Sequence, residues 1–167
     1  MAKVKERRKG GEDTAGRHVP PGGIVLVRDG TTLVSVAGPG IAVCFWNESH
    51  EVACLAHFAE PATYDPARAT ARFGNVALPT AISLVREVVG PSEIEAQIFG
   101  GAFQEDADRP KSEANIEMAR RILSARGVRI VSEDIGGAKG RKIVFQGSSG
   151  HVAVVKVHKL RAEDWQP

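Results

Sequence analysis

Three side chains of this sequence are suited to nucleophilic or acid–base chemistry by type and spacing. His57 lies in the apolar run Leu55-Ala56-His57-Phe58, and Cys44 and Cys54 lie in neighbouring apolar runs. A cysteine thiolate beside a histidine can act as a nucleophile whose proton the histidine removes. The turn Gly38-Pro39-Gly40 precedes the first of these runs, where a side chain would be exposed before a buried strand. That turn carries no nucleophile.

Neither cysteine is well placed by the sequence to serve His57. Cys44 lies inside a predicted strand, where a thiol packs as a small apolar group. Cys54 is three residues before His57, and residues three apart in a strand point to opposite faces, so contact between them would require a bulge. We interpret both as buried thiols in a reducing compartment and keep Cys54 as an alternative nucleophile. These residues lack zinc-site spacing, so no metal and no cofactor is predicted.

Length and composition predict one soluble domain. The chain has 167 residues, 43% hydrophobic and 25% charged, with no run near the roughly 18 apolar residues that a membrane span needs. Residues 1–19 hold six basic and three acidic side chains, whereas the remainder has a net charge of −1. We therefore expect a disordered basic tail over residues 1–22, a domain over 23–160 and a C-terminal tail over 161–167. A cytoplasmic protein without membrane insertion or nucleic-acid binding is expected.

Apolar periodicity predicts strands in the first third of the chain. The runs 24–27 and 33–36 flank Asp29-Gly30, which indicates a β-hairpin because glycine accepts a positive φ. The continuous apolar runs 41–46 and 52–58 are typical of strands covered on both faces, and we expect them to pair.

Helices and further strands are predicted in the remainder. Apolar residues at helical spacing predict helices over 78–89 and from the N-cap Ser112 to Gly127. Strands are expected at 95–99 and 128–131, and a closing hairpin at 143–145 and 152–157. The resulting fold class is α/β, a layered domain with a mixed sheet or two packed sheets and outer helices.

Four blocks of the sequence share their order and spacing with one protein family. They are Ile41-Ala42-Val43-Cys44-Phe45-Trp46-Asn47, Leu55-Ala56-His57-Phe58 with Pro61, Phe99-Gly100-Gly101-Ala102, and Glu133-Asp134-Ile135-Gly136-Gly137 with Gly140-Arg141-Lys142. Arg72-Phe73-Gly74-Asn75 and Asn115 also fall where that family has similar residues. The blocks resemble the chemoreceptor glutamine deamidase CheD, a family of bacterial and archaeal chemotaxis adaptation. The resemblance runs from about Gly23 to Leu160 and implies a CheD-like cysteine hydrolase fold.

The resemblance also implies a chemistry. In that family a cysteine thiolate attacks the side-chain amide of a receptor glutamine, a histidine acts as base and then as acid, and water releases glutamate from a thioester. The family's histidine falls on His57, and its cysteine falls, without a gap, on Gly40. The threonine that precedes the cysteine falls on Val34, and the glycine pair before Leu-Ala-His is Ala53-Cys54 here.

The resemblance therefore predicts a CheD-like chemotaxis protein whose nucleophile position is empty. Such a pseudoenzyme would bind a chemoreceptor's cytoplasmic region or the response-regulator phosphatase with which the family associates. Six positions are expected to shape the substrate- or partner-binding surface, namely Val34, Gly38, Phe99, Gly100, Gly101 and Asn115. Phe99-Gly100-Gly101 also has a purely structural interpretation, because glycine permits a turn or a close approach of two backbones.

Two other functions stay open. One is an active protein-glutamine deamidase that uses Cys54 or another nucleophile. The other is a small-molecule or nucleotide-binding domain that uses the loop from Gly136 to Lys142, although this loop lacks the GxxxxGK[ST] spacing of a phosphate-binding loop.

Overall fold

The computed structural model describes residues 16–158 and contains nine strands, two α-helices and two short 3-10 helices. The strands are β1 (Arg17–His18), β2 (Ile24–Val27), β3 (Thr32–Ala37), β4 (Ile41–Asn47), β5 (Val52–Phe58), β6 (Glu95–Gly100), β7 (Arg129–Ile135), β8 (Gly140–Gln146) and β9 (Val152–Val157). The helices are η1 (Pro66–Arg68), α1 (Gly74–Val89), η2 (Asp106–Asp108) and α2 (Arg109–Ala125).

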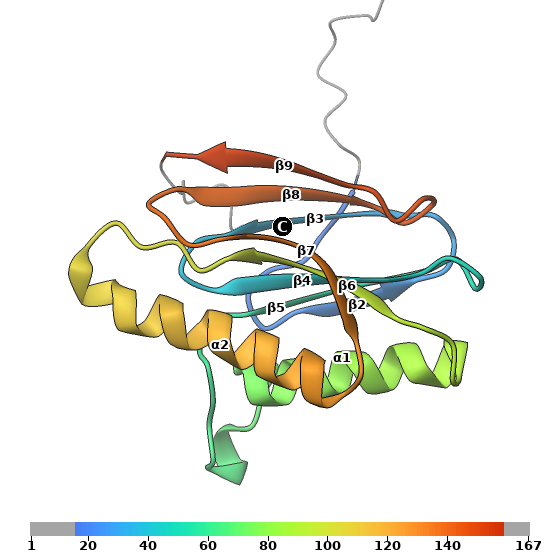
Figure 1. Cartoon of the computed structure of the whole chain (residues 1–167), viewed down its shortest axis with the longest axis horizontal. Coiled ribbons are helices and arrows are strands. Elements are labelled where there is room, and N and C mark those ends of the chain that lie inside the picture. Colours follow the sequence, from blue (N-terminus) through green and yellow to red (C-terminus); the bar gives the residue numbers. More distant parts are fainter. Residues whose placement is uncertain (1–15, 159–167) are drawn as a thin grey trace, which may run out of the picture.

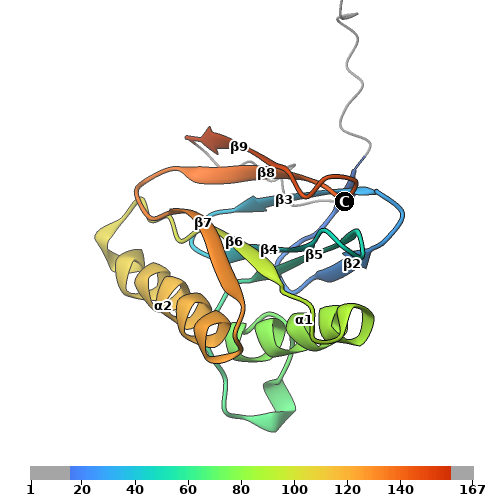
Figure 2. The same ribbon diagram turned by 45° about the vertical axis from the view of Figure 1, so that its right-hand side comes forward.

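The strands form two mixed sheets that pack face to face. One sheet has the order β1-β3-β8-β9 and the other has the order β2-β5-β4-β6-β7. Both views show α1 and α2 on the outer side of the five-stranded sheet and the four-stranded sheet on its other side (Figure 1, Figure 2). The predicted layered α/β domain with outer helices is therefore confirmed.

Two apolar cores separate the three layers. The core between the helices and the five-stranded sheet includes Phe45, Phe58, Leu78 and Ile98, all fully buried. The core between the sheets includes Leu33, Leu55, Ile143 and Phe145. Strands β4 and β5 contribute to both cores through alternate residues, which explains their continuous apolar sequence.

Both helices begin at earlier residues than predicted. Helix α1 begins at Gly74, four residues before the predicted start, and Pro79 lies inside it. Helix α2 begins at Arg109, so the prediction of Ser112 as its N-cap is wrong. Ser112 lies within the first turn, is fully buried, and donates a hydrogen bond from Oγ to the Ala102 carbonyl at 2.8 Å. That bond ties α2 to the loop after β6.

The predicted first hairpin is also wrong, although both of its strands exist. Strand β2 pairs with β5, and strand β3 pairs with β8, so the chain crosses from one sheet to the other at Asp29-Gly30. An Asx turn forms there, in which the Thr31 N–H donates to Asp29 Oδ1 at 3.0 Å. The turn depends on neighbouring residues, whereas the pairing of each strand depends on residues distant in the sequence that pack against it. The predicted pairs β4–β5 and β8–β9 are confirmed.

Residues 17–19, within the predicted basic tail of residues 1–22, contribute to the fold. Arg17–His18 form β1 in parallel with β3, and Val19 is fully buried. The rest of that tail, residues 1–15, and residues 159–167, which include the predicted C-terminal tail, lie outside the described residues. Within the described part, neither helix is long and apolar enough to cross a membrane.

Candidate functional site

The turn Gly38-Pro39-Gly40 joins β3 to β4 and is held by hydrogen bonds from the segment after β6 and from α2. The Ala102 N–H donates to the Gly38 carbonyl, and the Gly101 N–H donates to the Gly40 carbonyl, both at 2.9 Å. The turn is therefore fixed against the end of β6 by backbone hydrogen bonds.

Asn115 of α2 holds the same turn from the helix side. Its side-chain Nδ2 donates to the Pro39 carbonyl at 2.9 Å and to the Ala59 carbonyl at 3.1 Å, and the residue is fully buried. Ala59 directly follows β5, so one amide group joins the turn, the exit of β5 and α2. We conclude that Asn115 sets the spacing between the turn and β5.

His57 lies on β5, opposite Ala42 of β4, on the face that points toward the four-stranded sheet. Its exposed fraction is 1%, so the ring does not line an open cleft. The segment after β1 covers this part of β5, because the Gly22 N–H donates to the His57 carbonyl and the His57 N–H donates to the Gly23 carbonyl. His57 is a buried histidine in a packed interface.

Ser35 of β3 is a site residue that the sequence analysis missed. Its Oγ lies 2.9 Å from His57 Nδ1 and donates to the Val19 carbonyl at 2.6 Å. Because the hydroxyl has one hydrogen, Oγ accepts from Nδ1–H, and Nε2 therefore carries the lone pair of the ring. The available signal was a single hydroxyl at an inward position of the apolar run Leu33-Val34-Ser35-Val36-Ala37.

The site therefore has a hydroxyl beside its histidine even though Val34 occupies the family's threonine position. Alternate residues of β3 face opposite sides of the sheet, so Ser35 points to His57 and Val34 points to the other face.

Burial lowers the pKa of His57 to about 4. Removal of the ring from water disfavours the charged imidazolium, and the nearby His18 acts in the same direction, while a hydrogen bond with the Val19 backbone acts against it. The ring is therefore neutral at physiological pH.

Gly40 lies next to His57, in the arrangement that a nucleophile and its base would have. A Cβ atom built on Gly40 would lie 3.4 Å from His57 Nε2, the nitrogen that carries the lone pair. The same Cβ atom would lie 2.5 Å from the Phe58 carbonyl oxygen and 3.3 Å from the Ala59 Cα. Real Cβ contacts do not reach 2.5 Å, and the contacting atom belongs to the backbone, which cannot simply rotate away. The backbone of β5 thus occupies the space of a side chain at position 40.

The two cysteines lie away from this place. Cys54 packs in the core on the helix side of the five-stranded sheet, on the opposite face of β5 from His57. Burial raises the pKa of the Cys54 thiol to about 12. Cys44 packs between the sheets, and its burial also raises its pKa well above the ordinary value. Both thiols are protonated at neutral pH.

Phe99-Gly100-Gly101 forms the end of β6 and the close approach to the turn. Gly100 has φ +115°, and a Cβ atom there would lie 2.2 Å from the Gly40 carbonyl oxygen. Gly101 has φ +66°, and Phe99 packs in the core between the sheets. The two glycines are required by backbone conformation and by space.

The loop between β7 and β8, which the nucleotide-binding alternative would use, is fastened by the buried side chain of Arg141. Its Nη2 donates to Asp134 Oδ1 at 2.9 Å, and its Nη1 donates to the carbonyls of Gly136 at 2.6 Å and Lys139 at 2.5 Å. Arg141 is 3% exposed, so its guanidinium binds the loop itself.

The outer side of the turn is the accessible part of the site. A hollow of about 350 Å³ lies over Gly38 and Pro39 and extends to Phe103, Gln104 and Ala138. Among residues 16–158, no three His, Cys, Asp or Glu side chains come together to hold a metal ion. Asp108 also lines the hollow, so its lining combines backbone, apolar and amide groups with one carboxylate.

Comparison with known proteins agrees with this architecture. Residues 58–156 match the family model of CheD, described as chemotactic sensory transduction. The matched stretch begins one residue after His57, so it leaves out the turn and the histidine.

Curated relatives extend the similarity over most of the chain. A protein of Sulfurimonas denitrificans named "Probable chemoreceptor glutamine deamidase CheD" is 31% identical over 135 residues, which cover 77% of this chain and 86% of the relative. "Probable chemoreceptor glutamine deamidase CheD 1" of Anaeromyxobacter dehalogenans is 31% identical over 145 residues, 84% of each chain. A relative in Trichlorobacter lovleyi is 30% identical over 136 residues, which cover 79% of this chain and 84% of the relative. This chain therefore belongs to the CheD family of chemotaxis proteins.

Proposed function

We propose that this CheD family protein acts in chemotaxis by binding, without deamidating, the cytoplasmic region of a chemoreceptor. The relatives are named as chemoreceptor glutamine deamidases, which supports the receptor as the kind of partner. The observation that carries the proposal is the position of the Phe58 carbonyl oxygen, 2.5 Å from where a Cβ atom on Gly40 would lie.

The base of the family reaction is retained in this proposal, but it has nothing to activate. His57 is neutral, and the lone pair on Nε2 points toward Gly40, where there is no thiol whose proton it could remove. Thioester formation requires a nucleophile at that point, so the first step of the family reaction is absent. Binding does not require it, and the hollow over Gly38 and Pro39 offers a surface beside the former reaction centre.

The test uses the full chain and a receptor cytoplasmic fragment. Deamidation of one glutamine adds about 1 Da to the fragment, since an amide is replaced by an acid through the thioester route. We expect association without this mass gain, whereas a CheD protein that retains its cysteine serves as the positive control. A mass gain with this chain would reject the non-catalytic function. Absence of association would reject the receptor as partner, and the response-regulator phosphatase would then be tested by the same binding measurement.

The alternative in which Cys54 is the nucleophile has a separate test. Burial on the helix side and a pKa of about 12 predict that the Cys54 thiol reacts with iodoacetamide at pH 8 at least ~100-fold more slowly in the folded chain than in urea. Peptide mass spectrometry identifies which cysteine is labelled. Rapid labelling of Cys54 in the folded chain, followed by deamidation that Cys54→Ser abolishes, would favour the alternative instead.

A further inference from the structure

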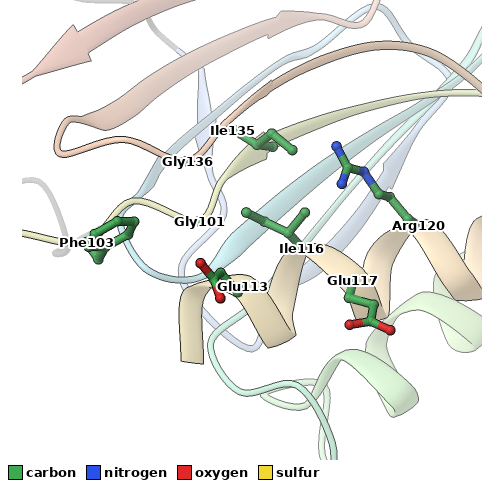
Figure 3. A pocket seen from close by; sticks show the side chains of 8 residues that line it. All are labelled: Gly101, Phe103, Glu113, Ile116, Glu117, Arg120, Ile135 and Gly136. Carbon is green, nitrogen blue, oxygen red and sulfur yellow. The ribbon is translucent and has the colours of Figure 1, made fainter. Parts of the chain in front are cut away.

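A groove runs between α2 and the ends of β6 and β7, on the helix side of the turn. Its volume is about 490 Å³, and Figure 3 shows Ile116 of α2 pointing toward Ile135 of β7 across it. Phe103 lies at one end and Arg120 at the other (Figure 3). The two isoleucines and Phe103 are only half-buried, so apolar surface remains available to a bound segment.

The wall formed by α2 is acidic. Glu113 and Glu117 are one helical turn apart, are exposed, and line the groove. Figure 3 shows Glu113 beside Ile116 and the Glu117 carboxylate on the outer side of α2. In residues 16–158 neither carboxylate forms an ion pair, whereas Arg120 is already held by Glu133 through Nε–Oε1 at 2.9 Å and Nη2–Oε2 at 2.7 Å. Two carboxylates beside an apolar floor suit a basic segment that also carries an aliphatic side chain.

The chain itself supplies such a segment outside the described residues. Residues 3–9 read Lys-Val-Lys-Glu-Arg-Arg-Lys, with five basic side chains, one acidic side chain and the aliphatic Val4. The remainder of the chain beyond residue 19 has a net charge of −1, so no other stretch of similar length concentrates positive charge in this way.

The connection is long enough. Gly16 lies beside Thr32, at the start of β3. Strand β3 runs for six residues toward the turn. The Gly40 carbonyl of the turn accepts a hydrogen bond from Gly101, which lines the groove. That path is on the order of 30 Å, one strand plus one helix diameter. Lys9, seven residues before Gly16, spans up to about 25 Å when extended and reaches only the near edge of the groove, whereas Lys3, thirteen residues before Gly16, spans up to about 45 Å and passes the whole path.

We propose that residues 3–9 bind in this groove of their own chain. Their basic side chains pair with Glu113 and Glu117, and Val4 covers the floor formed by Ile116 and Ile135. The bound segment lies against Gly101, next to the turn of the candidate site. This inference does not depend on the receptor or on the loss of deamidation.

Zero-length carbodiimide crosslinking of the full chain tests the proposal. At about 20 mM salt, where exposed charges interact over a longer range, we expect amide links from Lys3 or Lys5 to Glu113 or Glu117 to be at least ~5-fold more abundant than links to the exposed carboxylate of Glu87 on α1. Salt near 0.5 M, where exposed charges are screened, removes the preference. The change Glu113→Gln with Glu117→Gln removes the preferred links and leaves only the weaker ones to other carboxylates, whereas the matched Glu87→Gln variant keeps the preferred links.

Two results would overturn the proposal. Links distributed evenly over exposed carboxylates would show that the tail has no preferred site. Links found between a light and a ¹⁵N-labelled chain, but not within one chain, would show that a second copy is the acceptor. A second measurement is the rate of tryptic cleavage at Arg8 and Lys9, which the paired glutamine variant raises about 3-fold if the segment is bound. An unchanged rate would contradict binding.

Discussion

Two adjoining regions of the candidate site differ in the groups they offer to chemistry. The base region, formed by His57, Ser35 and the Val19 carbonyl, has every feature that orients a histidine toward a nucleophile. In the nucleophile region, at Gly40, where the resemblance predicts the nucleophile position, there is no side chain, and the β5 backbone occupies the space. His57 also has a structural role, since its buried ring fills the interface between the sheets and is hydrogen-bonded there. A histidine at a family's base position is therefore weak evidence of chemistry when considered alone.

The largest expected effect is a loss of folding stability in acid, which the buried His57 of the base region causes. His57 has a folded pKa of about 4, below its unfolded value of 6.5. Between these pH values the unfolded chain binds more protons than the folded chain, so the free energy of unfolding rises with pH. Acidification across this window should lower it by about 3 kcal/mol, at about 1.4 kcal/mol per pKa unit.

Urea unfolding at pH 4, 5, 6 and 7 measures this dependence. The variant His57→Gln should flatten the curve by one proton. An unaltered curve in His57→Gln would mean that the histidine is not buried in its neutral form.

A second experiment probes the nucleophile region. Gly40→Ala and Gly40→Cys should each lower the free energy of unfolding by about 2 kcal/mol, because either side chain forces the backbone away from Phe58. The two variants should be similar, since the clash begins at Cβ. A Gly40→Cys variant with the stability of the unmodified chain and measurable deamidation would show that the space is open and would make the two regions alike.

The smallest effect separates the hydroxyl from the ring. Ser35→Ala removes the acceptor of His57 Nδ1–H, at a cost of about 1 kcal/mol in the free energy of unfolding. Nitrogen chemical shifts of the imidazole should place the proton on Nδ1 in the unmodified chain, and Ser35→Thr should retain this tautomer. A proton on Nε2 in the unmodified chain would contradict the assigned role of Ser35.

Sequence reasoning succeeded where the signal was local. The helical spacing of Leu78, Ile82 and Val85, and the glycine-rich turn between β8 and β9, predicted elements that exist. It failed at Asp29-Gly30, because a turn signal does not specify with which distant strands the two flanking strands will pair. Ser112 misled for a related reason, since its hydroxyl binds a loop carbonyl and does not cap the helix.

The candidate site was predictable only in outline. The neighbourhood of Gly40 and His57 followed from the resemblance, and the opposite orientation of Cys54 followed from strand alternation. The position of the Phe58 carbonyl could not be predicted, because it depends on sub-ångström spacing between two backbones that Asn115 holds together. The assignment of His57 as the retained base position stays a prediction.

The crossing from β2 to β3 has a consequence for the order of folding. Ser35 pairs with Ile143, on the order of 100 residues later in the chain, so the middle of the four-stranded sheet forms only through contacts distant in sequence. Such contacts slow folding, because a long loop must close before the pairing can stabilise it. During synthesis β3 emerges long before β8 and has an unpaired edge in the meantime. We therefore expect the hydrogen bond between Ser35 and His57 to be among the last features of the domain to form.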